Sequence, residues 1–120
     1  MLRRPLSIQS LEKLKSGSLT RFRAAMPIAY CTLEIFIPYS QSLKDKRMIL
    51  RKAQDRLRAR SNFSIAEVDH QDLWQRAKLA AVTVGADNAV LERVTQDFVR
   101  EAEHILQELL VDCQVSYIEP

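Results

Sequence analysis

The sequence predicts an α+β domain with a ferredoxin-like βαββαβ order, in which two helices cover one face of a four-stranded antiparallel sheet. Three observations predict this arrangement. Apolar residues alternate with polar ones over 29–37, as in a half-buried strand; they recur at helical spacing over 43–60 and again from residue 87; and two strand-like runs lie between these helices. The length of 120 residues suits one domain with a single core.

The first half of the domain is predicted as a strand followed by a helix. The strand covers residues 29–37 and ends at Pro38. Ser42, followed three residues later by Asp45, resembles a capping box, so a helix is predicted over 43–60. Its apolar residues share one side, and the opposite side is mostly basic. One face of this helix is therefore expected to pack on the sheet.

The second half is predicted as two strands, a helix and a closing strand. Strands are expected over 63–69 and 78–85, and the short connection between them favours antiparallel pairing. Asp87 is expected to start a helix that runs to about residue 111, and the last strand covers 114–119. The first and last strands then pair antiparallel. Cys31 and Cys113, each near the start of its strand, are therefore expected at opposite ends, which disfavours a disulfide.

Charge divides the chain into two parts. Of the 18 Lys/Arg and 15 Asp/Glu, residues 1–25 hold six and one, which leaves 12 and 14 for the other 95 residues. Residues 1–25 are interpreted as a flexible basic N-terminal tail, or as a misassigned translation start because strand-like sequence begins near Met26; residues 26–120 form the domain. No apolar run suits a membrane span or an export signal, and two cysteines are too few for a disulfide framework, so a cytoplasmic protein is expected.

Two segments carry a family resemblance. Residues 42–47 read Ser-Leu-Lys-Asp-Lys-Arg, and residues 66–76 read Ala-Glu-Val-Asp-His-Gln-Asp-Leu-Trp-Gln-Arg. Together they resemble the YlxP-like family of small bacterial proteins of unknown function, over roughly residues 26–120, although Asp45 stands where Glu is more usual and the tail is a departure. The family-motif residues are Glu67, Gln71, Asp72, Trp74, Gln75 and Arg76.

The resemblance implies a ferredoxin-like fold and a bacterial cytoplasmic origin. It also implies a gene often found beside those for ribosome-binding factor A and a translation initiation factor, which is an association with ribosome maturation and not a mechanism. No catalytic residue carries over from the family.

The first predicted helix favours contact with RNA. Residues 43–60 hold eight Lys/Arg against two Asp, and such cations can bind phosphates without reading sequence. In the alternatives, the charges are solvated or are neutralised by the neighbouring helix region, since residues 87–112 hold seven acids against two Arg. The RNA-contact candidates are Lys44, Arg51, Lys52, Arg58 and Arg76.

The sheet face without helices is expected to be partly apolar. Aromatic side chains on such a face can stack on RNA bases, but the third predicted strand has no aromatic residue of the kind that RNA-recognition domains use. A mixed apolar face is more often buried against a partner, so a homodimer is expected. The dimer-face candidates are Tyr30, Phe36, Leu79 and Ala81.

A cluster of acids with one histidine raises the question of catalysis. Glu67, Asp69, His70 and Asp72 could bind a divalent metal or transfer protons. Strand alternation separates them, so they are interpreted as a polar connection in which Asp72 caps a turn and Trp74 is an anchor by burial. With only two glycines, the chain has no phosphate-binding loop. No catalytic residue, metal ligand or cofactor is assigned.

The sequence therefore favours a non-enzymatic accessory protein, linked to ribosome maturation or translation through RNA or ribosomal-protein contact. The expected partners are ribosomal RNA or a ribosomal subunit and a second copy of the chain, with no membrane or DNA. The first alternative is a homodimeric structural or regulatory module without nucleic-acid binding. The second and weaker alternative is a metal-dependent enzyme.

Overall fold

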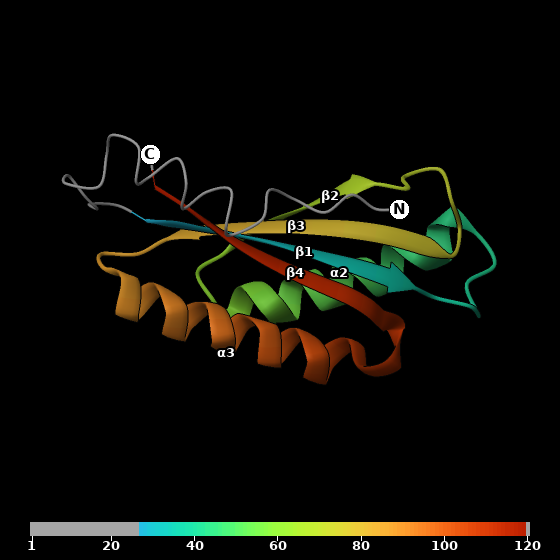
Figure 1. Cartoon of the computed structure of the whole chain (residues 1–120). Coiled ribbons are helices and arrows are strands. Elements are labelled where there is room, and N and C mark those ends of the chain that lie inside the picture. Colours follow the sequence, from blue (N-terminus) through green and yellow to red (C-terminus); the bar gives the residue numbers. More distant parts are fainter. Residues whose placement is uncertain (1–26, 120) are drawn as a thin grey trace.

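The computed structural model describes residues 27–119, and the predicted tail over residues 1–25 lies outside this range. The elements follow the predicted order (Figure 1). They are β1 (Ile28–Phe36), α2 (Leu43–Arg60), β2 (Ser64–Asp69), β3 (Arg76–Val84), α3 (Asn88–Leu106), the 3-10 turn η2 (Gln107–Leu109) and β4 (Leu110–Ile118).

The four strands form one sheet in the order β2-β3-β1-β4, and each neighbouring pair is antiparallel. Both helices lie on the same face of this sheet (Figure 1). The α+β, ferredoxin-like arrangement predicted from the sequence is thereby confirmed. Within residues 27–119, neither helix combines the length and the apolar composition needed to cross a membrane.

The core lies between the sheet and the two helices. Alternation along β1 turns Ala29, Cys31, Leu33 and Ile35 toward the helices, and all four are fully buried. α2 contributes Leu50, Ala53 and Leu57, and α3 contributes Leu91, Phe98, Ala102 and Leu106. The rings of Phe63 and Phe98 stack with centroids 4.1 Å apart, which ties the segment before β2 to α3.

α2 begins and ends where the sequence predicts. The Ser42 hydroxyl accepts a hydrogen bond from the Asp45 N–H at 3.0 Å, so Ser42 is the N-cap. Asp45 Oδ2 accepts from the Gln41 N–H, also at 3.0 Å. In the usual capping box the acidic side chain bonds the N-cap residue itself, whereas here it bonds the residue before it.

The C-terminal boundaries differ from the prediction. α3 ends at Leu106, and β4 already begins at Leu110, several residues before the predicted start. Gln107 ends the helix with φ 52°, and its N–H donates to the Glu103 carbonyl. The apolar run over 109–111 fits a helical period and a strand equally well. Pairing with β1 decides between them, because Leu110 lies opposite Ile35 in the sheet.

The expected separation of the two cysteines is wrong. β1 and β4 pair so that Leu33 faces Cys113 and Cys31 faces Val115, which makes the two cysteines diagonal neighbours in adjacent strands. The early start of β4 brings Cys113 to the middle of its strand. Both thiols are free, and diagonal positions are farther apart than a disulfide usually spans.

Candidate functional site

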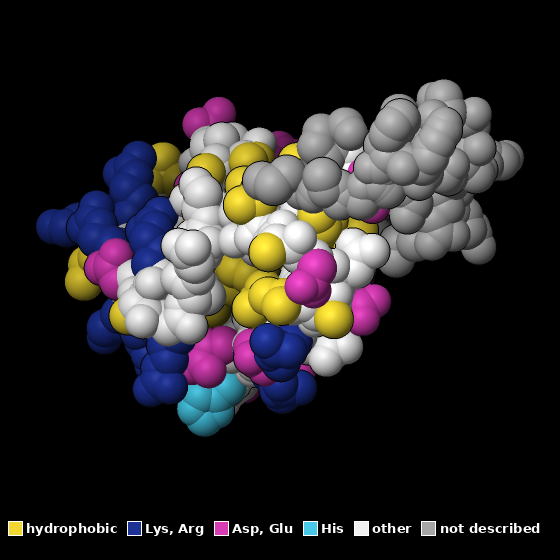
Figure 2. Space-filling model, turned by 90° about the vertical axis from the view of Figure 1, so that its left-hand side faces the viewer, with side chains coloured by type: hydrophobic (Ala, Val, Ile, Leu, Met, Phe, Trp, Pro, Cys, Tyr) yellow, Lys and Arg dark blue, Asp and Glu magenta, His cyan; other side chains and the backbone are white. Residues whose placement is uncertain are grey.

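The solvent-facing side of α2 carries a group of exposed cations, which we name the α2 basic face. Three of the RNA-contact candidates, Lys44, Arg51 and Lys52, are exposed on it. Figure 2 shows Lys and Arg side chains gathered along one side of the molecule. The other exposed members of the α2 basic face are Arg47 and Arg56.

The acids of α3 do not neutralise the α2 basic face. Among residues 27–119, the ion pair that joins the two helices is Arg60 Nε to Glu101 Oε2 at 3.8 Å, at the C-terminal end of α2. None of the five cations of the α2 basic face has an ion pair with an acid in the described part of the chain. Their charge is therefore available to an external anion.

Two other RNA-contact candidates have structural contacts. The Arg58 guanidinium donates to the Ile65 carbonyl at 2.8 Å and lies 3.6 Å from Asp55, so it links α2 to β2. Arg76 is the first residue of β3, where it pairs with Phe36 and its guanidinium lies 6.0 Å from the Phe36 ring. Its side chain is on the sheet face opposite α2, so the structure does not bring Arg76 together with the α2 basic face.

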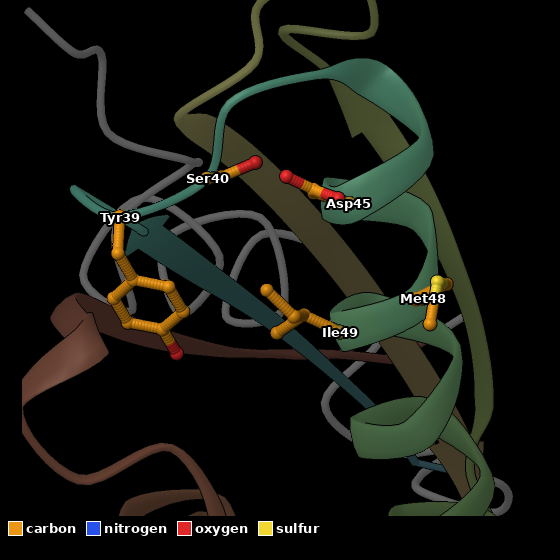
Figure 3. A pocket seen from close by; sticks show the side chains of 5 residues that line it. All are labelled: Tyr39, Ser40, Asp45, Met48 and Ile49. Carbon is orange, nitrogen blue, oxygen red and sulfur yellow. The ribbon is translucent and has the colours of Figure 1, made fainter.

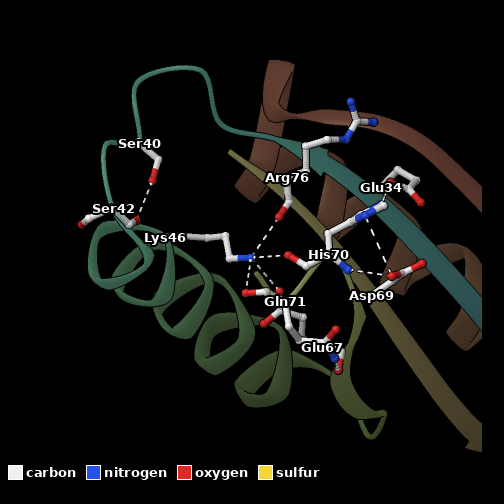
Figure 4. Close-up of polar contacts among 9 residues, drawn as sticks. All are labelled: Glu34, Ser40, Ser42, Lys46, Glu67, Asp69, His70, Gln71 and Arg76. Carbon is white, nitrogen blue, oxygen red and sulfur yellow. Dashed lines mark hydrogen bonds and ion pairs between the residues drawn. The ribbon is translucent and has the colours of Figure 1, made fainter. Parts of the chain in front are cut away.

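Lys46 is buried, although the sequence includes it in the basic run of α2. Its side chain is 1% exposed. The ammonium donates to the carbonyls of His70 at 2.8 Å and Arg76 at 3.0 Å, with a longer contact to Gln71 at 3.5 Å (Figure 4). It also lies 3.0 Å from Glu67 Oε2, a buried oxygen that has no hydrogen bond among the described residues. Lys46 thus clamps the connection between β2 and β3 onto the first turns of α2.

These contacts bring the two family-motif segments together. Residues 42–47 supply the helix start and Lys46, and residues 66–76 supply the carbonyls and the carboxylate that surround its ammonium. The Gln75 amide donates to the Pro38 carbonyl at 2.9 Å and to the Ser40 carbonyl at 3.1 Å. The Gln71 amide donates to the Glu67 carbonyl at 3.4 Å. The motif residues Glu67, Gln71 and Gln75 therefore hold the loops around the start of α2 in place.

Trp74 differs from its predicted role. It is 55% exposed, and the neighbouring Leu73 is 46% exposed, so Trp74 is not an anchor held by burial. The turn is instead closed by the Leu73 N–H donating to the His70 carbonyl at 3.0 Å, with His70 at φ 65°. Backbone hydrogen bonds and Lys46 order this connection, which leaves both apolar side chains at the surface. Asp72 is exposed beside them.

The acids around His70 point in different directions. Glu67 faces Lys46 on the helix side, whereas His70 Nε2 lies 3.3 Å from Glu34 Oε1. Asp69 Oδ1 accepts from the His70 N–H at 2.8 Å. Within residues 27–119, no three His, Cys, Asp or Glu side chains lie close enough together to hold a metal ion.

The sheet face opposite the helices, which we name the open face, carries only two of the four dimer-face candidates. Tyr30 and Phe36 lie on it as predicted, and Phe36 is 38% exposed. Leu79 and Ala81 do not, because β3 pairs with β1 so that they face Leu33 and Cys31 and are buried under the helices. The β3 residues on the open face are Arg76, Lys78, Ala80, Val82 and Val84.

The fold and the site define a small ferredoxin-like α+β domain with a clamped strand connection and a basic helix face. Residues 28–115 match the family described as protein of unknown function, DUF503. Because this match spans most of the chain, the chain belongs to that family.

Two comparisons with individual proteins agree with this assignment. The uncharacterized protein YlxP of Bacillus subtilis (strain 168) is 32% identical over 69 residues, which cover 58% of this chain and 75% of the relative. The resemblance to the YlxP-like family is thereby confirmed. The de novo designed protein Foldit4 superposes with a TM-score of 0.52 at 9% identity, over 79% of this chain and 98% of the design. That likeness concerns the fold alone.

Proposed function

We propose that the protein is a non-enzymatic, cytoplasmic accessory protein that contacts RNA phosphates through the α2 basic face, in ribosome maturation or translation. The observation that carries the proposal is the set of five exposed cations on α2 without an acidic partner in the described part of the chain. Exposed Lys and Arg side chains bind phosphates by point charge and by guanidinium forks.

Within the described residues, the small number of ion pairs between α2 and the neighbouring acidic helix α3 also supports this proposal. If the charges of α2 served only to pair with α3, ion pairs would run along the whole helix interface. Among residues 27–119 one pair at one end, Arg60 with Glu101, joins the two helices and leaves most of the positive charge of α2 facing solvent. Charged surfaces of this kind attract polyanions at long range.

The test is binding of the full chain to purified ribosomal subunits and to a structured RNA, over a series of salt concentrations. We expect the double variant Arg51→Glu, Lys52→Glu to bind at least about tenfold more weakly, because each reversal removes an attraction and adds a repulsion. The slope of log affinity against log salt should fall by about two, one for each phosphate that the variant no longer neutralises.

The matched control is Arg93→Glu, Arg100→Glu on α3, which changes the net charge by the same amount at exposed positions of the other helix. It should bind much like the unmodified chain. Equal weakening by both double variants would show a general charge effect and would contradict contact through α2. No change in either variant would assign any binding to another part of the chain.

A second proposal concerns self-association, favoured by exposed apolar side chains on the open face. Phe36, Val82 and Val84 are 38%, 39% and 57% exposed there. We propose that two copies pair through this face, which leaves α2 free on the opposite side. Sedimentation equilibrium should show a dimer that Val82→Lys weakens, whereas Met48→Lys, at an exposed position of α2, should not. A monomer at all concentrations would contradict this proposal.

A further inference from the structure

A pocket of about 160 Å³ lies between the first turns of α2 and the loop that follows β1. Figure 3 shows the Tyr39 ring and the Ile49 side chain on either side of it, with oxygens of Ser40 and Asp45 pointing toward one another at one end. Met48 completes the lining. Because a cavity of about 150 Å³ can hold benzene, this pocket has room for one aromatic ring.

The walls of the pocket suit a flat aromatic ligand. Tyr39 and Met48 are 61% and 58% exposed, so a ligand can reach both side chains from solvent. A phenol ring offers a stacking surface, and a thioether makes favourable contacts with aromatic rings. The pocket therefore has an open side lined by groups that bind planar π systems.

The polar end of the pocket offers hydrogen-bond acceptors. Ser40 is 1% exposed and its hydroxyl donates to the Ser42 carbonyl at 3.2 Å, so the acceptor that a ligand can reach there is the half-buried Asp45 carboxylate. Asp45 uses Oδ2 to accept from the Gln41 N–H, and a carboxylate has further acceptor capacity. An exocyclic amino group on a ring, such as those of adenine and cytosine, matches this end.

The surroundings of the pocket supply positive charge. Met48 is separated by three or four residues from Lys44, Arg51 and Lys52, so on a helix these cations are its immediate neighbours. All three belong to the α2 basic face. A base that enters the pocket would thus place the phosphates on its two sides among cations that lack an acidic partner in the described part of the chain.

We propose that this pocket receives one unstacked base of single-stranded RNA, stacked on Tyr39, with its amino group directed at Asp45 and its flanking phosphates on Lys44, Arg51 and Lys52. This inference rests on the proposed function and adds to it the form of RNA and the residues that contact the base. Paired bases are held within a duplex, so a duplex can reach the cations but not the pocket.

The test is fluorescence anisotropy of the full chain with labelled oligo(rA), oligo(rU) and a paired RNA duplex of the same length. We expect oligo(rA) to bind more tightly than oligo(rU) and the duplex. Tyr39→Leu keeps an apolar side chain but removes the ring, so it should weaken oligo(rA) binding by about tenfold and leave duplex binding unchanged. The control is Trp74→Leu, which removes another exposed aromatic ring that does not line the pocket.

Each outcome separates this inference from the proposed function. Equal binding of single strand and duplex, unchanged by Tyr39→Leu and by Met48→Ala, would overturn the base pocket and leave phosphate contact intact. Absence of binding to any RNA would overturn both. Displacement of oligo(rA) by polyglutamate of equal charge, as readily as by unlabelled oligo(rA), would show that the surface binds acidic chains in general and would also overturn the base pocket.

Discussion

At the scale of single residues, Lys46 makes the contact on which the strand connection most depends. Lys46→Met would leave Glu67 Oε2 without its cation and the His70 and Arg76 carbonyls without their donor. We expect the free energy of unfolding to fall by about 3 kcal/mol, the low end for a broken buried pair because Glu67 is 22% exposed. Urea denaturation measures this loss.

The control for that experiment is Lys44→Met, two residues earlier on the same helix and exposed. It should change the free energy of unfolding by no more than about 0.5 kcal/mol. Adding Glu67→Leu to Lys46→Met should recover part of the stability, because the orphaned carboxylate is then removed. Equal effects of the two lysine variants would show that Lys46 is not a clamp.

The two cysteines should make the free energy of unfolding depend on pH. Burial raises the pKa of Cys31 from 9.0 to about 12, with a smaller contribution from Cys113, and burial raises the pKa of Cys113 from 9.0 to about 11. Between about pH 9 and pH 11, the thiols of the unfolded chain have lost their protons, whereas both thiols of the folded chain keep theirs. The unfolded state then binds fewer protons, so the free energy of unfolding should fall as the pH rises above about 9.

Urea unfolding at neutral pH and at about pH 10 tests this dependence. The double variant Cys31→Ala, Cys113→Ala should lose less stability over that interval than the unmodified chain, since lysines and tyrosines titrate in both proteins and cancel in the comparison. The same pH dependence in both proteins would contradict the role of the thiols.

At the scale of elements, the start of α2 depends on one hydroxyl. Ser42→Ala removes the acceptor of the Asp45 N–H and should lower the free energy of unfolding by about 1 kcal/mol, the usual cost of a lost N-cap. Thermal unfolding followed by circular dichroism measures the change. Ser64→Ala, at an exposed position of β2, is the matched control and should have little effect. Similar losses in both variants would argue against the cap.

The junction between β3 and α3 requires a glycine at position 85, because a larger side chain would press against Leu91. A Cβ on Gly85 would lie 3.0 Å from the Leu91 Cβ and 3.3 Å from its Cα. Gly85→Ala should therefore lower the free energy of unfolding by about 1–2 kcal/mol, because the first turn of α3 must move. An alanine without such a contact would instead stabilise by about 0.4–1 kcal/mol. A gain in stability, measured by urea denaturation, would contradict the close packing.

At the scale of the whole molecule, the sheet should not be uniformly stable. β1 is hydrogen-bonded on both sides, to β3 and to β4, and its inner side chains form the centre of the core. β2 is short, pairs only with β3 among the described strands and has a bulge between Glu67 and Asp69. We expect amide hydrogen exchange to be slowest in β1 and clearly faster in β2, as measured by NMR. Equal protection of the two strands would contradict this order.

Only those parts of the candidate site that depend on the pattern of neighbouring residues could be predicted from the sequence. The exposed cations of α2 follow from helical periodicity, and the Ser42 cap follows from residue type and spacing. The face of Leu79 and Ala81 does not, because residues 79–82 of β3 are apolar on both faces, and only the pairing with β1 places Leu79 and Ala81 opposite the buried Leu33 and Cys31. The exposure of Trp74 could not be predicted from its residue type either. Backbone hydrogen bonds hold the connection between β2 and β3 in place, so the connection does not need the Trp74 ring to be buried.

The sequence by itself determined the order of elements, the fold class and the limits of α2, because alternation, helical period and capping act within a few neighbouring residues. The resemblance of residues 42–47 and 66–76 to a known family indicated the family. Tertiary structure alone decided that Lys46 is buried, that α3 ends at Leu106, and that Cys31 and Cys113 are neighbours. Each of these depends on partners more than twenty residues away or on the pairing of β1 with β4. A local pattern cannot specify such contacts, because the same lysine, leucine or cysteine suits both environments until the distant segment is in place.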